Sequence, residues 1–280
     1  MKYLITLLFM FPTELVAQTS LIFNKRFVEC EDKWVAFQSD KDSTYAFGFI
    51  YIDSQAGLTL NYEGRFKIGN TGNLVLTKMI DSTSIKVRLQ PNQVKVALIP
   101  ETKFAELRIT PIPNWLRFYK TDTTSIERLF RWGFLYNSWD ECAKALTYLE
   151  KAQKLNPKHK GLEFELAYAY NCSLQFDKAI VVLKNAILTS PNECHLFKEL
   201  SYAEMSTGKL SEASETCKKG ISICTEKPMK AEIAYNMSFH YFKNGDKTNF
   251  KYWADETEKW ATKGDQFTSM ITKLKHEMAK

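Results

Sequence analysis

The sequence lacks the short motifs that accompany metal binding and covalent catalysis. It has no C-x-x-C pair, no H-E-x-x-H pair, no G-x-S-x-G turn and no phosphate-binding glycine loop. Its four histidines, His159, His195, His240 and His276, are scattered along the chain without nearby carboxylate motifs. We therefore expect no catalytic residues, no cofactor and no metal site, and we predict a protein that is not an enzyme.

A strong charge of either sign is also missing. Lys and Arg number 38 against 32 Asp and Glu, which gives a net charge of +6, and the two signs are interspersed. A surplus this small favours solubility but does not predict a nucleic-acid partner. Hydrophobic residues make up 45% of the chain and charged residues 25%, which is typical of globular domains.

Long hydrophobic runs are absent after the first twenty residues. Residues 3–11 form an apolar run that is too short to cross a bilayer, because a spanning helix needs about 20 residues. Lys2 precedes the run, Pro12 ends it, and small residues follow near Ala17. We predict a signal peptide over residues 1–18 and export to the periplasm or surface of a bacterial cell. An N-terminal anchor or a buried strand is the alternative.

Cysteines are few. The six are Cys30, Cys142, Cys172, Cys194, Cys217 and Cys224. In an exported protein an even number is compatible with disulfides. However, Cys217 and Cys224 are seven residues apart on one predicted helix, or about 10 Å by helical rise, which is too far for a bond. We expect buried free thiols that behave as small hydrophobic side chains, with disulfides as the alternative.

The first half of the chain alternates between short apolar runs and polar turns. The runs cover residues 34–37, 45–52, 58–62, 66–68, 74–76, 85–89, 94–99 and 107–109. They are rich in aromatic and β-branched residues, and turn sequences such as residues 70–73 separate them. Seven or eight short strands with frequent turns predict an antiparallel β sandwich or barrel over residues 19–112.

The pattern changes after Pro111 and Pro113, because proline cannot extend a strand ladder. We predict a linker over residues 113–124, in which the apolar residues 115–119 dock the two domains together. From residue 125 onward the apolar spacing becomes helical. The fold class that follows is a two-domain α+β chain with an all-α domain over residues 125–280.

The helical half carries a 34-residue period. Pro157 and Pro191 end apolar helical stretches at this spacing. The same spacing matches Gly133 with Ala167, Tyr136 with Tyr170, Ala145 with Ala179, Leu149 with Leu183 and Ala152 with Ala186. A third set of small residues follows at Ser201, Ala213 and Gly220. Over about residues 126–264 the chain resembles the tetratricopeptide repeat (TPR) family. The resemblance implies an α-solenoid of about four helical hairpins with a capping helix at its end.

The resemblance also implies that the first helix of each hairpin lines an inner face where partners bind. The partner-binding residues that we predict there are Phe130, Phe134, Asn137, Phe164, Tyr168, Asn171, Tyr202, Tyr235 and Phe239. Large aromatic side chains are common anchors of binding surfaces. The alternatives are packing between repeats for the rings and a solvated helix position for the asparagines.

Together these features predict a non-enzymatic exported scaffold that binds a protein or peptide partner, with no nucleic acid and no transmembrane span after signal removal. One alternative is glycan or cell-wall binding by the β domain, with Trp34, Tyr45 or Tyr62 stacking on sugars. Another is an enzyme resembling the prolyl isomerases that carry appended repeats.

Overall fold

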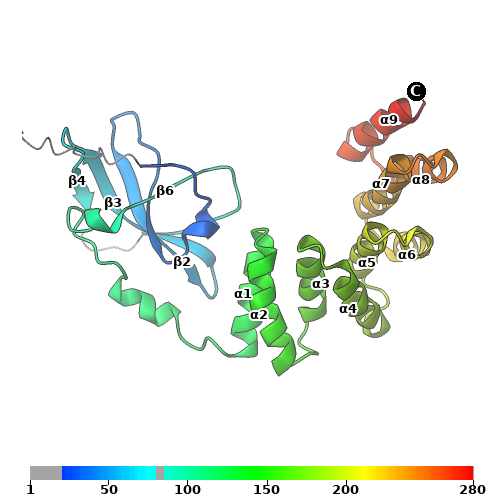
Figure 1. The fold of residues 1–280 in the computed structure, drawn as a ribbon, viewed down its shortest axis with the longest axis horizontal. Helices are drawn as coiled ribbons and strands as arrows, with labels where there is room; N and C mark the ends of the chain where they lie inside the picture. Colours follow the sequence, from blue (N-terminus) through cyan, green and yellow to red (C-terminus); the bar gives the residue numbers. More distant parts are fainter. Residues whose placement is uncertain (1–20, 80–84, 280) are drawn as a thin grey trace, which may run out of the picture. The chain divides into compact units, whose positions relative to one another are not determined.

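The computed structural model describes residues 21–79 and 85–279, and the chain divides into two compact units. The first unit runs up to Thr121 and contains the sheet, and the second begins at Asp122 and is helical (Figure 1). The predicted signal peptide lies outside the described residues.

The first unit is built on an open antiparallel sheet of six strands, in the order β4-β3-β2-β1-β6, with β5 also paired to β3. The strands are β1 (Lys33–Ala36), β2 (Tyr45–Asp53), β3 (Gly57–Ile68), β4 (Leu74–Met79), β5 (Ile85–Arg88) and β6 (Ala97–Leu98). The predicted sandwich or barrel is therefore wrong. The sheet does not close, and the described residues of this unit form no second sheet facing it.

Two differences from the predicted strands have local causes. Residues 58–62 and 66–68 belong to one long strand, β3, whose pairing with β4 shifts register at Arg65 and Phe66. Residues 107–109 do not form a strand, because Arg108 has a φ of 57°. This left-handed backbone conformation interrupts an extended run.

A short 3₁₀ helix, η3 (Asn114–Tyr119), covers one face of the sheet. The Trp115 ring lies 5.0 Å from the Tyr51 ring, Tyr119 lies 4.6 Å from the same ring, and Leu116 is buried. Of the residues that we predicted to dock the two domains, Leu116 belongs to the core of the sheet unit and Trp115 and Tyr119 pack against it, whereas Phe118 is 68% exposed. A helix in place of a second sheet explains how this open sheet buries its aromatic face.

The second unit is an array of helices in which consecutive pairs form hairpins (Figure 1). The helices are α1 (Ile126–Ser138), α2 (Cys142–Leu155), α3 (Leu162–Cys172), α4 (Phe176–Thr189), α5 (Cys194–Ser206), α6 (Leu210–Ile223), α7 (Lys227–Lys243), α8 (Lys247–Trp260) and α9 (Gln266–Met278). Helices α2, α4 and α6 begin at 34-residue intervals, which confirms the predicted period. We number the hairpins 1 to 4 from α1–α2 to α7–α8, and α9 follows hairpin 4.

Small residues let the two helices of a hairpin approach closely. Ala145, Ala179 and Ala213 are fully buried on α2, α4 and α6. At Gly133 of α1 an added Cβ would lie 2.3 Å from the Cγ of Leu149. The repeating small residues therefore mark the contact between the helices, as the sequence predicts for a TPR-like array.

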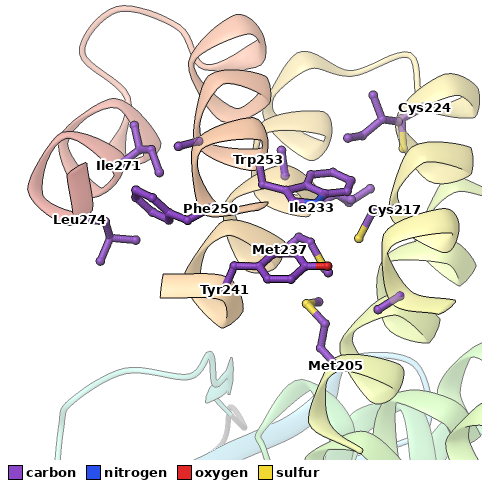
Figure 2. Close-up of a cluster of buried hydrophobic side chains, with 14 residues drawn as sticks. Met205, Cys217, Cys224, Ile233, Met237, Tyr241, Phe250, Trp253, Ile271 and Leu274 are labelled. Carbon is purple, nitrogen blue, oxygen red and sulfur yellow. The ribbon is translucent and has the colours of Figure 1, made fainter. Parts of the chain in front are cut away.

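A buried cluster at the end of the array joins α6, α7, α8 and α9 and includes Met205 of α5. Trp253 and Phe250 of α8 lie among Met237 of α7 and Ile271 and Leu274 of α9, and all five are buried (Figure 2). Because α9 contributes apolar side chains to this cluster, it covers the end of hairpin 4.

Two disulfides link the helices, so the expectation of free thiols is wrong for four of the six cysteines. Cys142–Cys172 joins the start of α2 to the end of α3, and therefore hairpin 1 to hairpin 2. Cys194–Cys224 joins the start of α5 to the residue after α6, and so closes hairpin 3. These are helix ends that the stacking of antiparallel helices brings together.

The other two cysteines, Cys30 and Cys217, are free and buried, as expected. Burial raises the pKa of the Cys217 thiol to about 12. A thiol that stays protonated is a poor nucleophile, so Cys217 behaves as a core residue.

Candidate partner-binding face

Three predicted aromatic residues repeat at the hairpin spacing. Phe134, Tyr168 and Tyr202 lie at 34-residue intervals on α1, α3 and α5. Each follows the small residue that packs on the second helix, such as Gly133, and is thus turned about 100° away from that contact. Phe134 is 41% exposed and Tyr202 39%, whereas Tyr168 is half-buried.

The other four predicted rings are half-buried and touch neighbouring rings. They are Phe130 and Phe164 on α1 and α3, and Tyr235 and Phe239 on α7. The Tyr235 and Phe239 rings stack at 6.2 Å, and Phe267 of α9 lies 5.8 Å from Tyr235. We call the seven rings together the aromatic row. Packing between repeats therefore explains part of the row, while Phe134 and Tyr202 remain open to solvent.

Two histidines that the sequence left without a role lie against the row. His159 lies 4.7 Å from the ring of Phe130, and His195 lies 6.0 Å from the ring of Phe164. His159 lies on the segment that leads into α3, and His195 lies in the first turn of α5. The two phenylalanines are 34 residues apart, whereas the two histidines are 36 apart, so a search at the repeat period does not find the pair.

Beside Phe164 there is a hollow of about 440 Å³, between the starts of α3 and α5 and the end of α4. Its lining residues are Lys160, Gly161, Glu163, Phe164, Ala186, Ser190, Glu193, His195 and Leu196. The hollow therefore combines apolar side chains, Phe164, Ala186 and Leu196, with charged ones such as Lys160, Glu163 and Glu193.

The two predicted asparagines are buried between successive first helices. The Nδ2 of Asn137 donates to the carbonyl oxygen of Glu165 at 2.9 Å and to its carboxylate at 2.8 Å. Asn171 makes the same pair of bonds to Glu199, at 3.1 and 2.9 Å. A solvated position is therefore wrong for both, since Asn137 is 4% and Asn171 2% exposed. Each asparagine links its hairpin to the next one. The sequence contains a signal for these bonds, because each glutamate lies 28 residues after its asparagine.

The Asn137 bonds predict a pH-dependent variant. Burial raises the pKa of Glu165, and the bond from Asn137 opposes this. Asn137→Asp replaces the donor with a second carboxylate, and we expect it to cost about 2 kcal/mol or more of unfolding free energy at neutral pH. Carboxylates whose folded-state pKa is raised bind protons more tightly when folded, so part of the loss should return as the pH falls. Urea unfolding at neutral and mildly acidic pH measures both effects.

The control for this variant is Asn185→Asp on the exposed side of α4. It makes the same chemical change without a buried neighbour, and its stability should stay within about 0.5 kcal/mol of the wild type. Equal losses in the two variants would contradict the role that we assign to Asn137.

Within the described residues, no group of three His, Cys, Asp or Glu side chains is arranged to hold a metal ion. In the same residues, no helix combines the length and apolar character that a membrane span requires. The predicted absence of an enzyme activity stays a prediction.

The sugar-binding alternative depends on exposed rings in the sheet unit. Trp34 is only 4% exposed, and its Nε1 donates to the carbonyl oxygen of Thr110 at 2.8 Å. The Tyr45 ring stacks on Phe66 at 5.3 Å. Trp34 is therefore a core residue, and Tyr45 is half-buried and packs against the core, with the Phe23 ring also stacked on it at 6.2 Å. Neither ring presents a free face to a sugar.

No protein-family model matches the chain, and no curated protein matches it. Among solved structures, MamA of MSR-1 is 18% identical with a TM-score of 0.43, and the match covers 52% of this chain and 84% of that chain. MamA from residue 41 to the end, from Desulfovibrio magneticus RS-1, is 16% identical with a TM-score of 0.43, and covers 64% of this chain and 88% of that one. Values this low assign no family and carry no function over.

Proposed function

We propose that the chain is an exported, non-enzymatic scaffold that binds a protein or peptide partner through the aromatic row. The observation that carries this proposal is the repetition of Phe134, Tyr168 and Tyr202 at the hairpin spacing, with two of the three rings exposed. Regularly spaced rings on successive helices suit an extended or helical segment that crosses several hairpins. Aromatic side chains supply much of the energy of such contacts.

Export is supported by the two disulfides, because disulfides persist mainly in oxidising compartments. The predicted signal sequence agrees with this. The hollow beside Phe164 supports a peptide partner, because it offers a place for one anchoring side chain next to the row.

Site-specific crosslinking in the native host tests this function. We expect a photoreactive residue placed at Phe134 or Tyr202 to capture the same partner. A photoreactive residue at Thr147, exposed on α2, should not capture it. If a photoreactive residue at Thr147 captures the partner equally well, the proposal is wrong, because the aromatic row is then not the contact face.

Substitution of the two exposed rings tests the energetics. Phe134→Ala with Tyr202→Ala should weaken binding of the captured partner at least about tenfold, since each anchor contributes about 1–2 kcal/mol. Circular dichroism should stay unchanged, because neither ring belongs to the buried core. Tyr252→Ala, which removes a ring that is 47% exposed on α8, is the matched control. Isothermal titration with the purified partner distinguishes the variants.

A further inference from the structure

Helix α4 carries aliphatic side chains on its solvent side. Val181 is 62% and Leu188 82% exposed, and they are seven residues apart, so both lie on one side of the helix. Leu174, in the turn before α4, is 71% exposed and continues the seven-residue spacing. We call these three residues the α4 stripe. Exposed aliphatic residues aligned in this way are unusual on a monomer and mark contact surfaces.

The fold itself does not require the α4 stripe. The residues 34 positions earlier, in hairpin 1, are Asp140, Thr147 and Lys154, and those 34 positions later, in hairpin 3, are Gly208, Glu215 and Ser222. All six are exposed, and none is aliphatic. Hairpin 2 therefore carries three aliphatic side chains where the same positions in hairpins 1 and 3 are polar or glycine.

Leu174 adds a backbone cost to its exposure. Its φ is +59°, in the left-handed region that bulky residues disfavour. The equivalent turn positions hold Asp140, at φ +58°, and Gly208, at φ +76°. Aspartate and glycine tolerate this conformation better. A leucine that is both strained and exposed indicates a contact that offsets the cost.

Charges beside the α4 stripe reveal which partner it fits. Asp177 and Lys184 lie on the same flank of the stripe, one on each side of Val181 along the helix. Leu174 lies seven residues before Val181 and Leu188 lies seven residues after it. The flanking charge is negative on the side of Leu174 and positive on the side of Leu188. A face with this pattern is complementary to itself when the two helices run antiparallel.

We propose that α4 pairs antiparallel with α4 of a second copy of the chain, about a twofold axis at Val181. In this pairing Val181 meets Val181 of the partner subunit, and Leu174 meets Leu188 of the partner subunit. Asp177 lies beside Lys184 of the partner subunit, and the axis makes each of these contacts twice. Such an isologous contact is the commonest way in which soluble proteins form dimers.

The charged residues are available for this exchange. Asp177 is paired with Lys209 at 3.3 Å, and its side chain is 87% exposed. Lys184 lies 3.8 Å from Glu204, and its side chain is 58% exposed. The exposed Asp177–Lys209 pair contributes little to folding, so rearranging it costs little. The Glu204 side chain is only 2% exposed, and it keeps the hydrogen bond from the Thr216 hydroxyl at 2.7 Å when Lys184 turns to the partner subunit. Three aliphatic side chains per copy are few for a stable interface of about 800 Å² on each partner, so the dimer should be weak and depend on concentration.

Sedimentation velocity over a concentration series tests the dimer, with the full mature chain. The wild type should shift from monomer toward dimer as its concentration rises. Val181→Thr with Leu188→Glu should sediment as a monomer throughout. Leu155→Thr is the matched control, because it removes a side chain that is 59% exposed at the end of α2 and installs the residue found 34 positions later. It should dimerise like the wild type. A wild type that stays monomeric, or a double variant that still dimerises, overturns the proposal.

A charge exchange between copies tests the antiparallel arrangement. Asp177→Lys alone and Lys184→Asp alone place like charges together in each homodimer, so each variant should dimerise at least about tenfold more weakly than the wild type. An equimolar mixture of the two restores both ion pairs and should recover dimers. Mixing leaves each chain's internal contacts unchanged, so recovery reports the contact between copies. No recovery in the mixture overturns the proposed pairing. Because this face is separate from the aromatic row, the result does not depend on the proposed partner binding.

Discussion

Loss of both disulfides is expected to lower the unfolding free energy of the helical array by about 6–8 kcal/mol. Each bond joins cysteines with a sequence separation of 30. A closed loop of this size restricts the unfolded chain enough to stabilise the fold by about 3–4 kcal/mol. Few other changes to this chain would cost as much, because most single substitutions cost about 0.5–3 kcal/mol.

Urea unfolding followed by circular dichroism measures this loss in a variant with all four bonded cysteines replaced by alanine. Cys30→Ala is the control, because Cys30 is free and lies in the sheet unit. It should leave the transition of the array unchanged. If a reducing agent does not lower the urea concentration at which the wild-type array unfolds, the disulfides do not stabilise the array. In host cells, the four bonded cysteines should resist alkylation until a reductant is added, as expected for an exported protein.

Truncation of Trp253 is expected to cost about 3–5 kcal/mol and to act on one end of the array. Its ring is 1% exposed and lies at the centre of the cluster that joins α6, α7, α8 and α9 (Figure 2). In a linear array each hairpin is stabilised mainly by its neighbours. The damage should therefore stay near α7–α9 and leave α1–α4 nearly unaffected.

Hydrogen exchange resolved by segment measures the effect of Trp253→Ala. Amides of α7, α8 and α9 should lose protection, while those of α1 to α4 keep it. Tyr252→Ala is the control on the adjacent residue, because that ring is 47% exposed. It should change protection little anywhere. A uniform loss of protection across all hairpins would show that the array unfolds as a single unit.

The helical half was predictable because its signal is periodic. Small residues such as Ala145 and Ala179 recur every 34 residues where the two helices of a hairpin touch. The 34-residue spacing therefore locates the same contact in successive hairpins. The same regularity placed Phe134 and Tyr202 on equivalent turns. Burial of Asn137 was not predicted, because its glutamate partner lies on a different hairpin. To predict it, one has to notice that a glutamate follows each repeating asparagine by 28 residues and can therefore be its hydrogen-bond partner.

The sheet half was harder to predict. The local sequence indicates where strands lie, but it does not indicate whether the sheet closes on itself. Alternating apolar residues located most strands, but they do not specify what covers the sheet. Trp115 and Tyr119 follow two prolines and read as a linker, although they pack on Tyr51. Disulfide pairing had the same difficulty. Cys142 and Cys172 meet only because α2 and α3 stack, and a residue count along one helix does not predict that contact.

The placement of the two disulfides decides how the array would respond to tension on its ends. A covalent bridge carries force directly from Cys142 to Cys172, and another does so from Cys194 to Cys224, so the residues between each pair bear no load. Only α1, α4 and the helices from α7 onward lie on the loaded path. Under stretching, the bridged segments would act as inextensible links, and the array would yield first at α4 or at its two ends.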